Sequence, residues 1–336
     1  MGAALHLGAV ACFSFFGSNK KKVQPKPPPD LALNMQVKAG DSVWTSIGFV
    51  KVESLLGEGS YGQVMKALWI SANRAVAFKI ELPQSVSSCV IGNAPQGYLT
   101  IEHEWRMMAA MNGTDGFPLV FAHNFSGKYK YYIMQLLGKS LSSVRKSSPE
   151  TRIRTRTLIH YGHQMLDRIE ALHSRDALMY DIHLGNFLVD ANNKVYVIDL
   201  GMAIPFRFKD GVHVGRGDSA VSNDCKNAYY ATRNDVQGFT VSRRDDLERL
   251  LYVLVDLNIN GLPWKREKKW KNVQKIKLKS QPSDICVKEA EWLKPALEHV
   301  FSLSFTDRPD YKFLHNVLDD RLNQLNLARK LLNRKP

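Results

Sequence analysis

The first part of the chain alternates hydrophobic and polar residues in the way that β-strands do when one face of a sheet is buried. The predicted strands cover residues 49–56, 63–70 and 74–82, and residues 129–137 supply two more strand-like stretches. In residues 99–111, by contrast, apolar residues recur at helical spacing, and Gly113 follows as a stop signal. The pattern therefore predicts a sheet accompanied by one helix.

From Gly138 onward, apolar residues recur every three or four positions, which is typical of helices with a buried face. The predicted helices cover residues 157–174, 245–257, 292–303 and 311–332. Two short strands, 187–189 and 195–198, interrupt them. We therefore expect an α+β fold of two lobes, a β-rich N-lobe at 44–137 and a helical C-lobe at 138–325. A length of 336 residues suits one two-lobed domain with tails.

The two ends of the chain lie outside these lobes. Residues 1–43 are first apolar, then basic and proline-rich, and this composition predicts a flexible leader. Residues 326–336 are predicted to form a basic tail. The apolar stretch at 3–16 is too short to span a membrane, and three lysines follow it. The leader is therefore predicted to be disordered, with a weak peripheral membrane anchor as the alternative.

The overall charge narrows the range of partners. The net charge of +14 at neutral pH suits acidic or phosphorylated protein partners, or an anionic membrane surface. No nucleic-acid-binding motif accompanies the charge, so nucleic acid is not an expected partner. The four cysteines are scattered without a CxxC pair, which indicates reduced thiols: Cys12, Cys89, Cys225 and Cys286. We expect a cytoplasmic monomer, with the nucleus and the membrane surface as alternative locations.

A glycine-rich segment separates the first two predicted strands. It runs Gly-Glu-Gly-Ser-Tyr-Gly and places glycines at Gly57, Gly59 and Gly62. Glycine has no side chain, so its backbone can lie close over phosphate groups. In a dinucleotide-binding fold the same spacing leads into a helix, whereas here residues 64–70 favour a strand. For the motif alone, a purely structural turn is the alternative.

A lysine in the third strand argues against that alternative. Lys79 lies within the apolar stretch Ala-Phe-Lys-Ile, and a lysine there is costly unless a carboxylate pairs with it. The expected partner lies on the following helix and is Glu104, with Glu102 as the alternative. Two residues along a helix point to different faces, so only one of them can fill this role.

Two acidic motifs follow in the second lobe, Asp-Ile-His-Leu-Gly-Asn from Asp181 to Asn186 and Asp-Leu-Gly from Asp199. With the glycine loop and Lys79 they form, in order, the parts that phosphoryl transfer requires. Asp181 would accept or orient the proton of a substrate hydroxyl, and Asn186 and Asp199 would hold magnesium. Taken alone, Asp-Leu-Gly is an ordinary turn after a strand, but its position in this series favours the catalytic reading.

The series resembles the casein kinase 1 group of protein kinases, including the tau-tubulin kinase branch, over roughly residues 48–325. Three further stretches are similar to that group: residues 134–141 to its hinge, 242–248 to the start of its helix F, and 307–311 to its late C-lobe signature. The resemblance implies a protein-kinase fold and a serine/threonine kinase that uses ATP and Mg²⁺ to phosphorylate protein substrates. It also implies that Asp246 braces the catalytic loop, residues 179–186.

The same resemblance implies how the nucleotide is held. Met134 is the implied gatekeeper, and Gln135 and Leu137 would offer backbone groups to adenine. Val64 and Ala77, on the strands that follow the glycine loop, complete the predicted nucleotide site together with the three glycines and Lys79.

The catalytic loop departs from the family pattern at two positions, because Tyr180 and His183 stand where the family has arginine and lysine. Near neutral pH a histidine carries charge only part of the time. Losing one preorganised charge-stabilising donor costs about 3 kcal/mol, or about a hundredfold in rate. We therefore expect a slow kinase with Lys79, Glu104, Asp181 and His183 as catalytic residues. The alternative is a pseudokinase that acts as a nucleotide-binding scaffold or interaction module.

A third departure concerns the substrate. By the resemblance, Tyr229 takes the place of an arginine that recognises substrate phosphate, while Lys268 retains a second basic element of that site. A preference for phosphorylated substrates is therefore expected to weaken, and a general preference for acidic substrates to remain.

Overall fold

The structure is a computed structural model that describes residues 37–59, 62–81, 100–126, 130–208, 210–217 and 228–333. Several features singled out in the sequence lie outside the described residues: most of the predicted leader, the tip of the glycine loop at 60–61, the last three residues of the tail, and Cys12, Cys89 and Cys225. Cys286 is described and is a buried free thiol.

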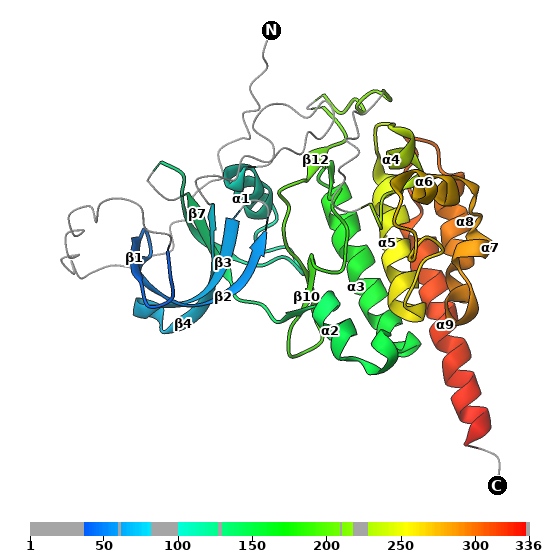
Figure 1. Ribbon diagram of the computed structural model, residues 1–336, viewed down its shortest axis with the longest axis horizontal. Coiled ribbons are helices and arrows are strands. Elements are labelled where there is room, and N and C mark those ends of the chain that lie inside the picture. Colours follow the sequence, from blue (N-terminus) through cyan, green and yellow to red (C-terminus); the bar gives the residue numbers. More distant parts are fainter. Residues whose placement is uncertain are drawn as a thin grey trace. The chain divides into compact units, whose positions relative to one another are not determined.

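A six-stranded antiparallel sheet forms the N-lobe (Figure 1), in the order β1-β2-β3-β4-β7-β6. Its strands are β1 (Ser42–Thr45), β2 (Gly48–Gly59), β3 (Gly62–Trp69), β4 (Arg74–Glu81), β6 (Val120–Asn124) and β7 (Tyr131–Gln135). One face of the sheet is covered by its own apolar core, in which Val52, Met65, Phe78 and Ile133 pack together. The hydrophobic residues that alternate with polar ones in the sequence are thus the residues that point into this core.

Helix α1 (Ile101–Ala110) lies beside the sheet. It begins at Thr100, whose side chain accepts a hydrogen bond from the backbone N–H of His103 at 3.1 Å. Ile101, Glu104 and Met108 form its buried face, so a carboxylate is carried into the interior together with two apolar residues.

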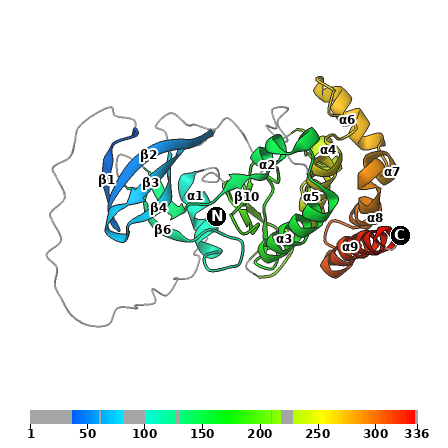
Figure 2. The same cartoon turned by 90° about the horizontal axis from the view of Figure 1, so that it is seen from below.

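The C-lobe is built around α5 (Arg243–Ile259), which is buried along almost its whole length. Figure 2 shows the surrounding helices from a second direction. These helices are α2 (Leu141–Ser147), α3 (Thr155–His173), α4 (Arg233–Gln237), α6 (Trp270–Lys279), α7 (Pro282–Ile285), α8 (Lys294–Ser302) and α9 (Tyr311–Leu332). None of the helices among the described residues is long and apolar enough to cross a membrane.

The described part of the C-lobe also contains short strands, most of which lie close to the two acidic motifs in the sequence. They are β8 (Lys139–Ser140), β9 (Ala177–Leu178), β10 (Phe187–Val189), β11 (Val195–Val197) and β12 (Ile204–Pro205). β10 lies between β11 and β8, and β9 pairs with β12. The β10–β11 hairpin therefore sets the two acidic motifs side by side, since one motif precedes β10 and the other follows β11.

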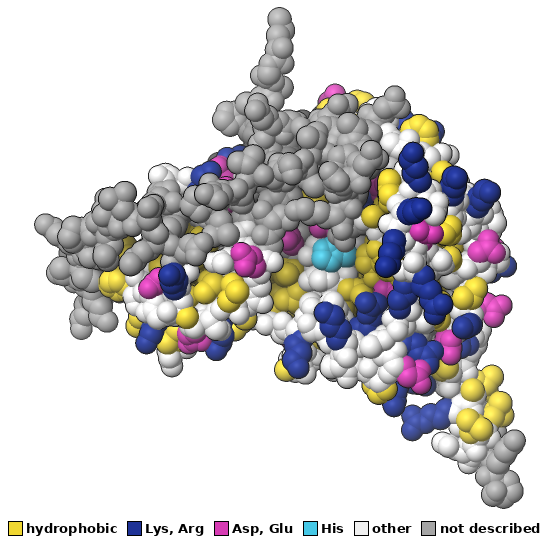
Figure 3. All heavy atoms as spheres, in the orientation of Figure 1, with side chains coloured by type: hydrophobic (Ala, Val, Ile, Leu, Met, Phe, Trp, Pro, Cys, Tyr) yellow, Lys and Arg dark blue, Asp and Glu magenta, His cyan; other side chains and the backbone are white. Residues whose placement is uncertain are grey.

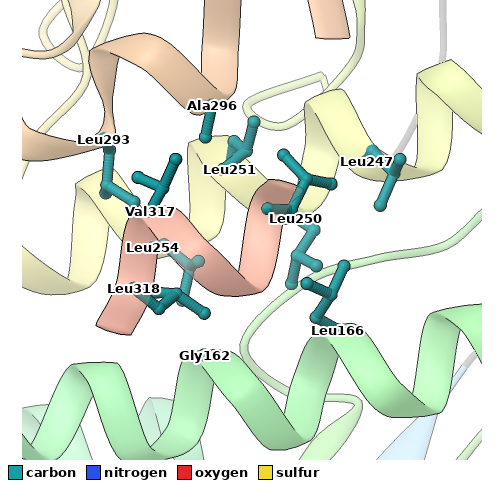
Figure 4. A pocket seen from close by; sticks show the side chains of 11 residues that line it. Gly162, Leu166, Leu247, Leu250, Leu251, Leu254, Leu293, Ala296, Val317 and Leu318 are labelled. Carbon is teal, nitrogen blue, oxygen red and sulfur yellow. The ribbon is translucent and has the colours of Figure 1, made fainter. Parts of the chain in front are cut away.

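An apolar cavity of about 20 Å³ lies between α3, α5 and α9, where Leu254 and Leu318 face Gly162 (Figure 4). A cavity of this size holds about one water molecule, and an apolar lining keeps such a space dry. It is therefore a packing defect of the helical core, and none of the acidic-motif residues lines it.

Most predicted elements are confirmed, and the differences have physical causes. Within 129–137 the described residues form one strand, β7, so the prediction of two was wrong. The strand next to it is β6, which lies upstream of that range, pairs with β7 and was missed in the sequence. The predicted helix at 292–303 is divided into a 3-10 turn, Lys288–Leu293, and α8, because Pro295 favours a helix start there. Among the described residues, the first strand begins at Ser42 and the last helix ends at Leu332.

Candidate active site

A buried ion pair joins the sheet to α1. The Nζ atom of Lys79, on β4, lies 2.6 Å from both carboxylate oxygens of Glu104. The hydroxyl of Tyr132, on β7, donates to Glu104 Oε1 at 2.7 Å. Asp199 Oδ2 lies 3.7 Å from the same Nζ. The predicted pairing of Lys79 with Glu104 is confirmed, whereas the alternative, Glu102, lies at the surface.

The charge of this lysine is stabilised by its neighbours. Burial alone would lower the pKa of Lys79, but the carboxylates of Asp199 and Glu104 outweigh burial and raise it. Burial raises the pKa of Glu104 in spite of the nearby ammonium group. Lys79 is therefore a fixed positive charge on β4, suited to hold an anionic group.

The glycine segment forms the predicted hairpin, in which Gly59 on β2 lies opposite Gly62 on β3. A Cβ atom at Gly62 would lie 1.9 Å from the carbonyl oxygen of Ile80, so packing against β4 alone requires glycine there. At Gly57 a Cβ atom would meet no described atom within 4 Å. The fold leaves that position open, as expected where a backbone approaches a ligand.

Apolar side chains line the space beside Lys79. Ala77 on β4 is paired with Met134 on β7, and both belong to a small cluster against which Val64 and Leu136 pack. The backbone N–H of Gln135 donates to Leu119 O at 2.8 Å. A nucleotide at this edge would therefore have to use the carbonyl group of Gln135. Leu137 follows β7 in the connection to the C-lobe, and its side chain is half-buried.

The catalytic loop is held from α5. The carboxylate of Asp246 accepts hydrogen bonds from the backbone N–H groups of Met179 at 2.7 Å and Tyr180 at 3.0 Å. Tyr180 has a φ of 65°, which is costly for a bulky residue unless the surroundings enforce it. The guanidinium of Arg249 lies 4.7 Å from the centre of the Tyr180 ring. The expected bracing by Asp246 is confirmed, and it holds the backbone just before Asp181.

The two acidic motifs meet beside this loop. Asn186 donates from its side-chain nitrogen to the carbonyl oxygen of Asp181 at 3.0 Å, and the backbone N–H of Ile198 donates to Asn186 O at 2.9 Å. Asp199 follows with a φ of 60°, and its Oδ1 atom lies 3.4 Å from the N–H of Gly201. Asn186 and Asp199 are therefore held next to each other from the ends of β10 and β11.

This pair offers oxygen ligands, which magnesium prefers. Because the Asn186 amide nitrogen is engaged, its oxygen is the atom that would face a metal, together with the carboxylate of Asp199. Within the described part of the chain there is no cluster of three or more His, Cys, Asp or Glu residues that could hold a metal by itself. The residues fit a magnesium ion that receives its remaining ligands from phosphate and water.

His183 lies within the catalytic loop and points its Nε2 atom toward Asp181 Oδ2, 3.6 Å away. Its Nδ1 atom accepts the backbone N–H of Gly185 at 3.0 Å. Burial lowers the pKa of His183, but Asp181 and Asp199 prevail and raise it. The charged ring would have to give up the bond from Gly185, because a protonated Nδ1 cannot accept. The histidine thus contacts the predicted base but lacks a permanent charge.

Two contacts of the site were not anticipated from the sequence. His103 on α1 lies with its Nε2 atom 2.9 Å from Ala203 O, which links α1 to the segment after Asp199. Tyr132 adds a second partner to Glu104. A histidine one residue before a buried glutamate on the same helix was a weak signal for the first contact, whereas no signal was available for the second.

Comparisons with known proteins agree with this fold. Residues 50–317 match the protein kinase domain family. A probable casein kinase I homolog of Encephalitozoon cuniculi (strain GB-M1) is 28% identical over 274 residues, which span 79% of this chain and 82% of the relative. A structure of vaccinia related kinase 3 has the same fold, with a TM-score of 0.69 and 20% identity over 87% of this chain and 93% of that chain. This chain therefore belongs to the protein kinase family, and within it resembles the casein kinase I group.

Proposed function

We propose that the protein is a serine/threonine kinase that transfers the γ-phosphate of Mg-ATP to protein hydroxyl groups. The observation that carries the proposal is the buried contact of Lys79 with Glu104, with Asp199 at 3.7 Å from the same ammonium group. A kinase needs a phosphate-binding lysine fixed by a carboxylate and placed close to the metal-binding Asp. Both requirements fit these distances.

The nucleotide would lie beneath the glycine hairpin. Lys79 would bind its phosphates, and the apolar pair of Ala77 and Met134 would pack against adenine. Asn186 and Asp199 would hold magnesium, which, when bound, neutralises the negative charge of the transferring phosphoryl group. The open position at Gly57 would let the β2 backbone lie over the phosphates.

Asp181 would act on the substrate. Its backbone is fixed on one side by Asn186 and on the other by the loop amides that Asp246 holds. A carboxylate held in this way can orient the attacking hydroxyl and accept its proton. His183 would hydrogen-bond near the transferring phosphoryl group, with positive charge only when protonated. We propose reduced turnover for this reason.

A pseudokinase is the second candidate, and one observation favours it. The Nδ1 atom of His183 accepts from Gly185, an arrangement that needs the neutral ring, so this geometry supplies no positive charge near Asp181. In that case the intact contacts of Lys79 and Asp199 would bind nucleotide or stabilise a scaffold for other proteins, and the protein would transfer no significant amount of phosphate.

Acidic proteins are the proposed substrates, acted on by a cytoplasmic monomer. Lys and Arg side chains are spread over the helical lobe on the face shown in Figure 3. A basic segment, residues 265–279, contains one acid, Glu267, and the following exposed cations: Lys265, Arg266, Lys268, Lys269, Lys271, Lys275 and Lys279. The hydroxyl of Tyr229, by contrast, is bonded to Asp256 Oδ1 at 3.0 Å. This arrangement supports attraction of acidic chains rather than recognition of one substrate phosphate.

The test is a transfer assay with labelled ATP and magnesium on the full chain and on an acidic peptide that contains serine. The wild-type protein is compared with Asp199→Asn and with Asp320→Asn, a matched change at an exposed position on α9. Transfer by the wild type and by Asp320→Asn, but not by Asp199→Asn, supports the kinase. Absence of transfer from a wild-type protein that still binds Mg-ATP supports the pseudokinase.

A further inference from the structure

A hydrogen-bonded series leads from the first residue of α9 to the catalytic loop. The hydroxyl of Tyr311 lies 2.6 Å from Nδ1 of His173, and Nε2 of the same ring lies 3.1 Å from Asp246 Oδ2. That oxygen also accepts the N–H of Met179 at 2.7 Å. Only the His173 ring therefore separates the Tyr311 hydroxyl from the oxygen that holds the loop.

The donors and acceptors in the series follow from chemistry. The carboxylate of Asp246 can only accept, so Nε2 of His173 carries the proton. In the neutral ring Nδ1 then accepts, and the hydroxyl of Tyr311 is its donor. Burial raises the pKa of Tyr311, so the hydroxyl keeps its proton over the physiological range. With the neutral ring, this arrangement of protons satisfies every contact in the series.

All three side chains are shielded from water. Tyr311 is 6% exposed, the side chain of His173 is 2% exposed, and Asp246 is fully buried. In such surroundings a polar group that loses its partner cannot find water instead. If Tyr311 no longer donated, His173 would have no fixed partner for Nδ1 and its ring could turn away from the carboxylate.

The position of Tyr311 is set by apolar packing, independently of its hydroxyl. Figure 4 shows Val317 and Leu318 of α9 packed over α3 and α5. A Cβ atom at Gly162 would lie 3.1 Å from Leu318 Cδ2, so α9 lies close against α3 at this point. Removal of the hydroxyl alone should therefore leave α9 in place.

We infer that Tyr311 is a positioning residue: through His173 it fixes the Asp246 carboxylate that holds the catalytic loop. The consequence for the reaction rests on the proposed function, whereas the consequence for the loop does not. The C-terminal helix thereby takes part in the geometry of a site that is formed by distant parts of the sequence.

The experiment compares Tyr311→Phe with Tyr161→Phe. Tyr161 is a matched control, since it is also buried and its hydroxyl bonds to Asn193 Oδ1 at 3.2 Å, outside the series. Hydrogen exchange is measured at the backbone amides of Met179 and Tyr180 in the full chain. We expect Tyr311→Phe to speed exchange at these two amides about fivefold, the effect of losing one typical hydrogen bond, and Tyr161→Phe to leave it unchanged.

Transfer of phosphate provides the second readout. We expect Tyr311→Phe to lower kcat about fivefold with little change in KM for ATP, because the loop carries Asp181 and not the nucleotide-binding groups. Unchanged exchange in Tyr311→Phe, or equal increases in both variants, would overturn the inference. Faster exchange with unchanged kcat would overturn the role in the reaction. If the wild type transfers no phosphate, the proposed function fails while the exchange comparison still decides the inference.

A measurement on the wild-type protein covers the case in which Tyr311→Phe does not fold. Side-chain ¹⁵N resonances of His173 are expected to show a single tautomer with the proton on Nε2. A ring that exchanges between tautomers, or one protonated only at Nδ1, would overturn the series of bonds.

Discussion

The ammonium group of Lys79 contacts both carboxylate oxygens of Glu104 at 2.6 Å, although the two residues are 25 positions apart. The contact joins the middle of the N-lobe sheet to α1. Because Asp199 of the second acidic motif is also close to Lys79, this one ion pair relates three separate segments of the chain.

Replacing Glu104 should cost far more than replacing its neighbour Glu102. Glu104→Gln removes one partner of a buried pair and leaves the charge of Lys79 only partly compensated, so we expect the free energy of unfolding to fall by about 3 kcal/mol. Glu102 pairs with Arg106 at the surface at 2.6 Å, and Glu102→Gln should change stability by less than about 0.5 kcal/mol. Chemical denaturation measures both. Equal effects would contradict the buried pairing.

Mg-ATP should stabilise the protein against thermal unfolding. A ligand at a hundredfold excess over its Kd adds about 2.7 kcal/mol to the free energy of unfolding. Asp199→Asn should reduce the magnesium-dependent part of the shift, because an amide binds the ion more weakly than a carboxylate. Asp320→Asn, with the same chemical change on α9, serves as the control. A wild-type protein without a shift at millimolar Mg-ATP would show that the nucleotide site is not functional.

A lysine at position 183 should speed transfer. His183→Lys supplies the permanent charge that the imidazole lacks, and we expect kcat to rise by up to about a hundredfold with a smaller change in KM for ATP. Steady-state rates of the two proteins measure this. The charge argument fails if the lysine variant is no faster than the wild type.

The same argument gives a pH dependence. The pKa of His183 is raised, so its charged form is present below that pKa and is lost as pH rises through it. Wild-type kcat should therefore fall as pH rises above about 6.5, the ordinary histidine pKa. His183→Gln cannot titrate and should lack this fall. A similar decline in the glutamine variant would assign the pH effect to another group.

A histidine pair between α3 and α9 should make stability depend on pH. The Nδ1 atoms of His163 and His315 lie 2.7 Å apart, so one proton must bridge them. Nε2 of His163 faces Asp319 and Nε2 of His315 faces Asp167, each at 3.2 Å. Hydrogen bonding to Asp167 raises the pKa of His315, with Glu170 contributing, whereas burial lowers that of His163.

The direction in which each pKa shift changes stability with pH follows from the linkage between proton binding and folding. The stabilisation of the folded state by His315 is fully present below about pH 6.5, and it is lost as pH rises through the raised pKa of this residue. The contribution of His163 is present above that pH and is lost as pH falls through its lowered pKa. Stability due to the pair should therefore peak near pH 6.5, by about 1 kcal/mol relative to its flanks.

Denaturation curves between about pH 5 and pH 8.5 test this prediction. His315→Ala should flatten the peak. His160→Ala is the control, because His160 is an exposed histidine of α3 that bonds to Gln164 rather than to α9. A peak that survives in His315→Ala would exclude the pair as its source.

The sequence by itself determined the elements with strong periodicity and the order of the chemical groups. Helix α9 was predicted at the residues where it is found, and the strands around Lys79 differ from prediction by only a few residues. These features can be predicted from the sequence because hydrophobic periodicity, capping residues and glycines lie within or next to the element that they specify. Helical spacing likewise showed that only one of Glu104 and Glu102 can face Lys79, and the structure identifies Glu104.

The tertiary structure alone decided which residues meet across the fold. Strand β6 has no strong pattern of its own, and its place in the sheet is given by its pairing with β7. The contact of Tyr311 with His173 spans 138 positions, and that of His163 with His315 spans 152. Such partners depend on how helices pack in space, since packing angles and register follow from the shape of whole interfaces. No local pattern contains that information, so the chemistry of these contacts becomes visible only when the chain is folded.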